Sequence, residues 1–153
     1  MNTLELKIPP PVIALVAGFA MWLSTHQVPA LALELPGRLA LCSALVMAGG
    51  VFDISALLAF LKAKTTINPL RPDKTSVMVI VGIYRYSRNP MYFGLLLVLA
   101  GWATYLSHAL PFLIVPLFVA YMNRFQIAPE EKVLSARFGP EYSAYKQSVR
   151  RWI

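Results

Sequence analysis

The sequence has little charge. Lysine, arginine, aspartate and glutamate make up only 14% of the 153 residues, whereas hydrophobic residues make up 58%. Soluble domains contain about 25% charged residues, so this chain lacks the side chains with which a water-exposed surface is built. The composition excludes an ordinary soluble domain, and the length allows one domain, 1–153. We therefore predict a single-domain integral membrane protein.

Reactive and metal-binding side chains are also scarce. Cys42 is the single cysteine, which excludes a disulfide within the chain, and His26 and His108 are the two histidines. The sequence contains neither the spacing of zinc ligands nor a glycine-rich nucleotide loop. We expect no metal site, and we assign no chemical role to these three residues.

Long apolar runs, in contrast, occur four times. They cover residues 10–25, 39–61, 91–107 and 109–122, and Asp53 is the only charged residue in them. A helix of about 20 apolar residues crosses the bilayer core, so the first and last runs need flanking residues to span it. We predict an all-α integral membrane protein with about four transmembrane helices.

The predicted spans divide the chain into four segments. Two N-terminal spans occupy 1–62, a loop occupies 63–90, the last two spans form a tight hairpin in 91–127, and amphipathic helices follow in 128–153. The loop and the tail, with their edges, contain most of the fourteen Lys and Arg residues. The positive-inside rule therefore places both of them, and the N-terminus, on the cytoplasmic side, as in a protein of the bacterial inner membrane.

The net charge of +7 has two possible explanations. A basic protein can bind nucleic acid, but here the basic residues flank apolar runs. Attraction to the anionic headgroups of membrane lipids explains the same pattern more simply. We expect membrane lipids as partners, and no nucleic acid.

Polar residues concentrate in the stretch 84–94, YRYSRNPMYFG, where the third apolar run begins. Pro90 suits the first turn of a helix, and Asn89 suits the N-cap position before it. A helix start explains these two residues. It does not explain why Arg85 and Arg88 stand there among three tyrosines.

Acidic residues mark the beginning of the tail. Glu130 and Glu131 follow Pro129 at the start of a predicted amphipathic helix. Gly139 ends this helix, and Pro140 begins another. Because the helix dipole alone favours acidic residues in a first turn, a purely structural role is sufficient for Glu130 and for Glu141, which follows Pro140.

Three motifs in this half of the chain occur in a specific order. They are GIYRYSRNPMYFG from Gly82, EEKVL from Glu130 and FGPEYSAYKQSV from Phe138. In this order they resemble the isoprenylcysteine carboxyl methyltransferase family and its phospholipid methyltransferase relatives. The resemblance implies a membrane enzyme that uses S-adenosylmethionine, releases S-adenosylhomocysteine and methylates a lipophilic acceptor entering from the bilayer. Many members have Arg-His-Pro where this chain has Arg88-Asn89-Pro90, so no imidazole base is available at position 89.

The resemblance also implies where the cofactor binds. Arginine side chains would hold its carboxylate, acidic side chains would accept from its ribose or balance its positive charges, and tyrosine rings would face its sulfonium. The candidate cofactor-binding residues are Tyr84, Arg85, Arg88, Asn89, Pro90, Tyr92, Gly94, Glu130 and Glu131. The candidate catalytic residues are Arg124, which matches a family arginine and would orient the acceptor, and Glu131.

The chemical class of the acceptor stays open at this point. A carboxylate, such as that of an isoprenylcysteine, would cancel charge as it attacks a sulfonium methyl group. A phospholipid amine is the alternative, and it would need a base for which the sequence shows no clear candidate. A small transporter and a non-catalytic membrane protein are further alternatives.

Asp53 is an ionisable residue inside a predicted span. We expect it to pair with a basic or tyrosine side chain of a neighbouring helix rather than to contact the acceptor.

Overall fold

The structure, a computed structural model, describes residues 5–63 and 78–153, and helices dominate this part of the chain. The main helices are α1 (Pro10–Gln27), α2 (Arg38–Ala63), α3 (Pro90–Leu106), α4 (Ala109–Tyr121) and α5 (Ala128–Ser148). Shorter elements are the 3-10 turns η1 (Pro29–Leu31) and η3 (Gly82–Arg85) and the π-helical segment η4 (Met122–Ile127). The all-α prediction is confirmed. The predicted loop 63–90 lies outside the described residues up to position 77.

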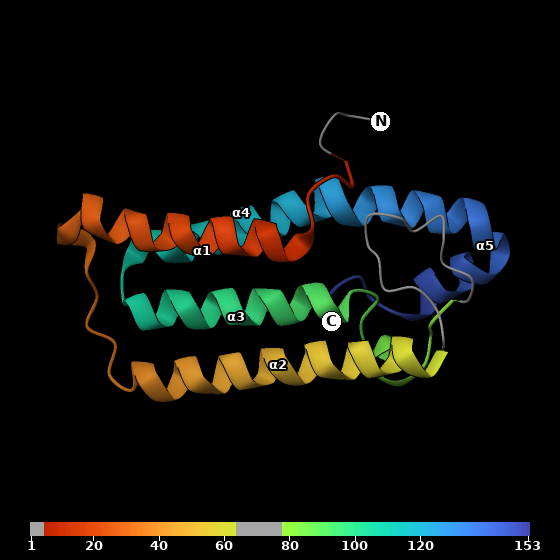
Figure 1. The fold of residues 1–153 in the computed structure, drawn as a ribbon, viewed down its shortest axis with the longest axis horizontal. Helices are drawn as coiled ribbons and strands as arrows, with labels where there is room; N and C mark the ends of the chain where they lie inside the picture. Colours follow the sequence, from red (N-terminus) through yellow and green to blue (C-terminus); the bar gives the residue numbers. More distant parts are fainter. Residues whose placement is uncertain (1–4, 64–77) are drawn as a thin grey trace.

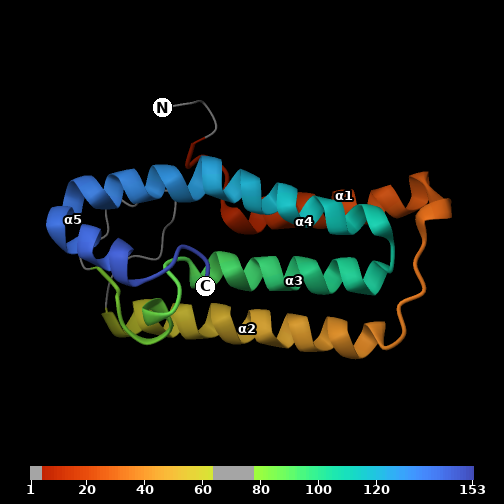
Figure 2. The same ribbon diagram turned by 180° about the vertical axis from the view of Figure 1, so that it is seen from behind.

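The first four main helices run alternately in opposite directions along one axis (Figure 1). Helix α3 is central: α2 packs on one side of it, and α1 and α4 pack on the other. Helix α5 continues beyond the bundle at the end where α1 and α3 begin and α2 ends (Figure 2). Helix α5 and residues 78–89 thus lie at one end of the bundle, which we call the cavity end. The opposite end, where α3 turns into α4, is the hairpin end.

Small residues bring α2 and α3 close together. A methyl group at Gly49 would lie 2.7 Å from the carbonyl oxygen of Gly94, and one at Gly101 would lie 3.2 Å from that of Cys42. Glycine thus permits backbone-to-backbone contact, which is the usual means of packing helices tightly in a membrane.

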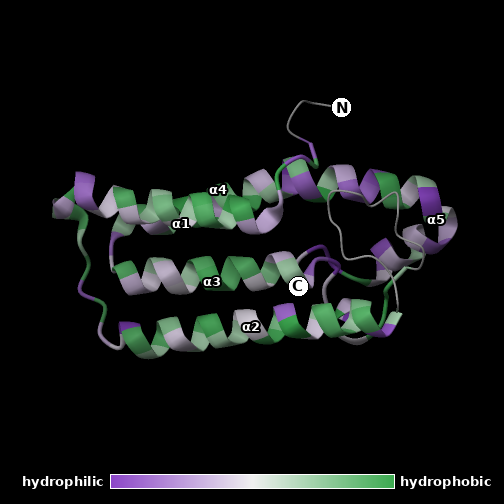
Figure 3. Ribbon diagram, in the orientation of Figure 1, coloured by the Kyte–Doolittle hydropathy of each residue, from purple (hydrophilic) through white to green (hydrophobic). Residues whose placement is uncertain are grey.

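The outer faces of the helices are apolar. Leu15 of α1, Met47 of α2 and Leu117 of α4 expose 73%, 66% and 65% of their surface, respectively. Among the described residues, two helices are apolar and long enough to cross a membrane, namely α2 and the continuous helix Ala109–Ser148, and α3 is apolar but shorter. Figure 3 shows that polar residues instead gather along α5. The fold is that of an all-α integral membrane protein, and the number of four crossings stays a prediction.

The hairpin between α3 and α4 is as tight as predicted. Ser107 ends α3 in the left-handed region, with φ of 49°. His108 then caps α4, because its Nδ1 accepts a hydrogen bond of 3.2 Å from the backbone N–H of Leu110. The other ring nitrogen of His108 lies 2.8 Å from the carbonyl oxygen of Val28. His108 therefore joins the start of α4 to the residue that follows α1.

Helix α5 begins at Ala128, within one residue of the predicted start at Pro129, but it follows α4 and η4 without a break. Proline lacks the N–H that would bond the carbonyl of Phe125 four residues earlier. The backbone N–H of Leu6 takes that place and donates to the Phe125 oxygen at 3.1 Å.

The break at Gly139 is confirmed: its φ of 53° and ψ of −123° bend α5, whose second part returns toward the bundle.

Candidate functional site

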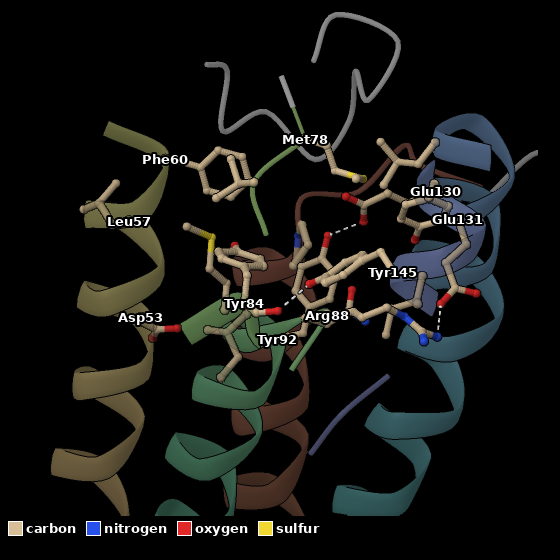
Figure 4. A pocket seen from close by; sticks show the side chains of 18 of the residues that line it. Asp53, Leu57, Phe60, Met78, Tyr84, Arg88, Tyr92, Glu130, Glu131 and Tyr145 are labelled. Carbon is tan, nitrogen blue, oxygen red and sulfur yellow. Dashed lines mark hydrogen bonds and ion pairs between the residues drawn. The ribbon is translucent and has the colours of Figure 1, made fainter. Parts of the chain in front are cut away.

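A cavity of about 510 Å³ lies at the cavity end (Figure 4). It is bounded by the start of α1, by α2, by the segment leading into η3, by the start of α3 and by α5. Its lining residues are Pro9, Pro10, Pro11, Asp53, Leu57, Phe60, Met78, Val79, Tyr84, Arg88, Asn89, Met91, Tyr92, Leu95, Ile127, Glu130, Glu131, Leu134, Tyr142 and Tyr145. The wall formed by α5 and the residues before α3 is polar, and the wall formed by α1 and α2 is largely apolar.

Arg88 ties the C-terminal segment to this wall. Its Nη2 donates to Oε1 of Glu131 at 2.8 Å, and its Nη1 donates to the carbonyl oxygens of Lys146 and Val149 at 2.9 and 2.6 Å. Its backbone N–H donates to the carbonyl of Arg150 at 3.0 Å. Its Nε is buried and has no partner among residues 5–63 and 78–153. One donor of a buried guanidinium is thus left for a ligand.

Glu131 is fully engaged by cations. Besides Arg88, Nη2 of Arg151 donates to its Oε2 at 2.7 Å. Burial acts to raise the pKa of Glu131, but the hydrogen bonds from Arg151 and Arg88 outweigh it and lower the pKa below its ordinary value. The carboxylate is therefore ionised and holds the wall together.

Glu130, which precedes Glu131 in the chain, lies in a different environment from Glu131. It lies in α5, beyond the apolar part of the continuous helix, and it accepts a hydrogen bond of 3.0 Å from the Tyr92 hydroxyl. Burial raises the pKa of Glu130 to about 7, against the opposing effect of that hydrogen bond. No cation of the described residues lies within ion-pair distance of it. A positively charged ligand would supply the missing partner.

Asn89 occupies the predicted N-cap position, and Pro90 begins α3 as predicted. The predicted capping bond is wrong, because the Asn89 side chain caps no N–H of α3. Its Nδ2 instead donates to the carbonyl of Arg151 at 2.9 Å. Asn89 and Arg88 therefore both hold the C-terminal segment against the start of α3.

Four tyrosines surround the polar wall. Tyr84, Tyr92 and Tyr142 are buried, and the hydroxyl of Tyr145 donates to the carbonyl of Tyr84 at 2.7 Å. Burial raises the pKa of Tyr84, Tyr142 and Tyr145, so these phenols stay neutral. Their rings offer π faces to a cation.

Asp53 reaches the cavity from the opposite wall, on α2 (Figure 4). In the part of the chain that the structure describes, its carboxylate makes no hydrogen bond and no ion pair. A methyl group at Gly94 of α3 would overlap this carboxylate. Gly94 therefore makes room for Asp53 and for the backbone of α2. The predicted approach of a cofactor to Gly94 is not supported, because Gly94 is covered by α2 and does not line the cavity.

Three other predicted site residues lie outside the lining. Pro90 is buried just behind it, and Arg85 is exposed on η3. Arg124 is 53% exposed and pairs with Glu5 at 3.0 Å, because η4 turns this side chain toward the segment before α1. The position of Arg124 does not support the predicted contact with an acceptor.

Several lining residues were missed by sequence reasoning. Tyr142 and Tyr145 are three residues apart and therefore share one face of a helix, a signal that was available in the sequence. The backbone carbonyls that Arg88 and Asn89 bind have no such signal, because every residue has a carbonyl group. Within 5–63 and 78–153, no three His, Cys, Asp or Glu side chains are grouped to hold a metal ion.

Fold and site together define a class: a helical membrane protein with a half-charged, half-apolar cavity at one end of its helix bundle. The family model "Phospholipid methyltransferase" matches residues 38–141, which include α2, α3, α4 and the first part of α5. The chain belongs to this family of membrane methyltransferases. An "Uncharacterized protein" of Haemophilus influenzae is 49% identical over 63 residues, which are 41% of this chain and the whole of that protein. No solved structure matches.

Proposed function

We propose that this protein is an S-adenosylmethionine-dependent methyltransferase that acts on a lipophilic acceptor at the cytoplasmic edge of the membrane. One observation carries the proposal: the cavity joins a charged wall, suited to a soluble cofactor, to an apolar wall, suited to a lipid. A binding site for a small molecule has a volume of about 300–1,000 Å³, and the 510 Å³ of this cavity lies in that range.

The residues of the charged wall fit the groups of S-adenosylmethionine. The free Nε of Arg88 suits the carboxylate, since a charge-assisted hydrogen bond would satisfy a buried donor. Glu130, which lacks a cation among the described residues, suits the ammonium group or a ribose hydroxyl. The tyrosine rings suit the sulfonium. Glu131 pairs with Arg88 and Arg151, and these ion pairs fix the positions of the side chains in this wall.

The apolar wall fits an acceptor that arrives from the bilayer. Leu57 lines the cavity and is also 40% exposed on the outer face of α2, where lipid would contact it. Pro9 and Pro11 are likewise lining and exposed. A hydrophobic chain would therefore keep its tail in the lipid while its head enters the cavity.

When bound, the cofactor supplies an electrophilic methyl group. The residues of the chain orient the acceptor toward it and exclude water from the cavity. Alignment of two reactants at near-contact distance is a large source of rate acceleration, and no covalent intermediate with the protein is required.

Calorimetric titration of S-adenosylhomocysteine into the detergent-solubilised protein tests the proposal. We expect Glu130→Gln to weaken binding at least about tenfold, which corresponds to about 1.4 kcal/mol, because the ligand loses a charged hydrogen-bond partner. Glu141→Gln is the matched control, since Glu141 is exposed on the same helix and does not line the cavity.

Transfer of a radiolabelled methyl group from S-adenosylmethionine into total membrane lipids and small lipophilic molecules would complete the test. A folded protein that binds neither S-adenosylmethionine nor its product would contradict the proposal. That result would favour a transporter or a non-catalytic membrane protein.

A further inference from the structure

The segment that follows α5 is bound to the residues that precede α3. We call this segment, residues 149–152, the C-terminal clamp. Nη1 of Arg88 donates to the carbonyl of Val149 at 2.6 Å, and Nδ2 of Asn89 donates to the carbonyl of Arg151 at 2.9 Å. The backbone of the clamp thus lies directly against two residues that line the cavity.

Two side chains of the clamp fix its position. Arg151 binds both oxygens of one carboxylate: its Nη2 donates to Oε2 of Glu131 at 2.7 Å, and its Nε donates to Oε1 at 3.2 Å. Nε1 of Trp152 donates to Oδ1 of Asn123 on η4 at 3.1 Å, and the Trp152 ring packs against the apolar cluster of α1, α3, α4 and η4. A two-point contact of arginine with a carboxylate fixes geometry as well as charge. The clamp is therefore attached at both a polar and an apolar point.

These contacts set the orientation of the Arg88 guanidinium, a planar group with five N–H donors. Its Nη1 donates to the carbonyls of Lys146 and Val149, and its Nη2 donates to Glu131 (Figure 4). The side chain is only 10% exposed, and its Nε has no partner in the part of the chain that the structure describes. Because the group is rigid and planar, contacts on its two Nη atoms also determine where the unpartnered Nε points.

We propose that Arg151 and Trp152 are positioning residues, which hold the C-terminal clamp so that the guanidinium of Arg88 is fixed to receive the carboxylate of the methyl donor. This inference rests on the proposed methyltransferase function, and it adds how the cofactor site is oriented. Neither residue lines the cavity, so both act through other side chains: Arg151 through Glu131 and Arg88, and Trp152 through the backbone of the clamp.

Two physical arguments support this role. A binding site whose donors are fixed in advance loses less conformational entropy when its ligand binds. The clamp also follows the part of the chain that the family model matches, which ends at residue 141. The role of the clamp is therefore assigned from the contacts of this chain.

Two ligands that differ only in the amino-acid group test the inference. S-adenosylhomocysteine and 5′-methylthioadenosine both contain adenosine and a thioether, but only the first has a carboxylate and an ammonium group. Each is titrated calorimetrically into the protein in detergent, and the wild type should bind S-adenosylhomocysteine more tightly. Arg151→Gln should weaken that binding about tenfold, as much as one hydrogen bond to a charged group contributes. Its affinity for 5′-methylthioadenosine should equal that of the wild type.

Further variants separate positioning from a general effect on the fold. Arg151→Lys keeps the charge and should recover part of the loss. Trp152→Phe keeps an aromatic ring but removes the N–H that Asn123 accepts, so it should weaken S-adenosylhomocysteine binding about threefold and leave 5′-methylthioadenosine binding unchanged. Arg150→Gln is the matched control: it removes one positive charge from the same segment, its side chain is exposed, and its backbone carbonyl is kept. Both ligands should bind this variant as they bind the wild type.

Equal loss of affinity for the two ligands in Arg151→Gln would overturn the inference, because a disturbed fold weakens the binding of every ligand. Unchanged S-adenosylhomocysteine affinity in both Arg151→Gln and Trp152→Phe would overturn it as well, and so would equal affinity of the wild type for the two ligands. In these cases the wild type still binds S-adenosylhomocysteine, so the methyltransferase proposal stands. If the folded wild type binds neither ligand, the methyltransferase proposal fails and this inference fails with it.

Discussion

The two ends of the helix bundle both place polar groups beside apolar spans, but they satisfy them differently. At the hairpin end, His108 caps α4 and contacts the carbonyl of Val28, and the carbonyl of Ser107 accepts from the N–H of Leu33 at 2.7 Å. At the cavity end, Arg88 holds Glu131 and the C-terminal segment, yet its Nε has no partner. In the described part of the chain, this Nε is the only buried side-chain nitrogen or oxygen without a hydrogen bond.

This difference indicates that the hairpin end has a structural role and that the cavity end binds a ligand. At the hairpin end, Ser107 and His108 bond neighbouring backbone groups, so they hold the turn. At the cavity end, the polar groups come from several helices. Asp53 and Glu130 form no ion pair with any of the described residues. A buried charge without a partner costs free energy, so such an arrangement is typical of a binding site. The following predictions test this comparison.

Replacing Arg88 by alanine should have the largest effect on stability. The side chains of Arg88 and Glu131 are only 10% and 14% exposed, and truncating one partner leaves the other charge buried. We expect a loss of about 3–5 kcal/mol, measured as the free energy of unfolding in detergent. Arg88→Lys keeps the charge and should recover part of this loss. Wild-type stability of Arg88→Ala would show that the cavity end does not depend on this pair.

Replacing Gly94 by alanine should destabilise the protein by about 1–3 kcal/mol, because the added methyl group overlaps Asp53 and lies 2.9 Å from the carbonyl oxygen of Gly49. The control is Gly50→Ala, where no atom lies within 4 Å of the added methyl group. A helical glycine replaced by alanine in open space should gain about 0.5–1 kcal/mol. Equal effects of the two substitutions would contradict the close contact of α2 and α3.

Replacing His108 by alanine should cost about 1 kcal/mol, since an N-cap hydrogen bond is lost at the hairpin end. Binding of S-adenosylhomocysteine should not change, because the cavity lies at the other end of the bundle. A thermal melt and a calorimetric titration of the same preparation measure both quantities. Reduced binding would mean that the two ends are coupled.

Affinity for the cationic cofactor should fall as the pH is lowered below about 7. The pKa of Glu130 is raised to about 7, and only the ionised carboxylate attracts a cation. One pH unit below that pKa, about a tenth of the carboxylate is ionised, so affinity should be up to about tenfold lower. Glu131 stays ionised over this range because its pKa is lowered. Glu130→Gln should remove the dependence.

The stability of the ligand-free protein should change in the opposite direction. Because the pKa of Glu130 is higher in the folded state than its ordinary value of 4.5, the folded state binds more protons between those values. Stability should therefore decrease as the pH rises from about 4.5 to about 7 and then level off. A thermal melt across this range checks the sign.

Replacing Glu5 by glutamine should have the smallest effect. The Glu5 side chain is only 9% exposed, but its partner Arg124 is 53% exposed, so water screens the pair and limits its contribution to stability. We expect a melting temperature indistinguishable from that of the wild type, and unchanged cofactor binding. A loss of methyl transfer in this variant or in Arg124→Ala would restore the predicted catalytic role of Arg124.

Sequence reasoning located most of the fold and part of the site. Apolar runs placed the four bundle helices within a few residues of their bounds, because burial in lipid requires long uncharged segments. Six of the predicted cofactor-binding residues line the cavity, namely Tyr84, Arg88, Asn89, Tyr92, Glu130 and Glu131, and their contact with a cofactor stays a prediction.

The resemblance also placed Arg85, Pro90, Gly94 and Arg124 in the site, and these four residues do not line the cavity. Which face of a turn or helix meets a neighbour depends on packing, and a motif does not report it.

The sequence by itself determined that this protein is helical, lies in a membrane and gathers its charge at one end, because these properties follow from composition and from the order of apolar and polar segments. Only the tertiary structure decided which charges are neutralised. Glu130 and Glu131 are neighbours in the chain, yet Glu131 meets two arginines, whereas Glu130 faces the cavity opposite Asp53. Neighbouring residues of a helix point in different directions, so their partners come from the packing of distant segments.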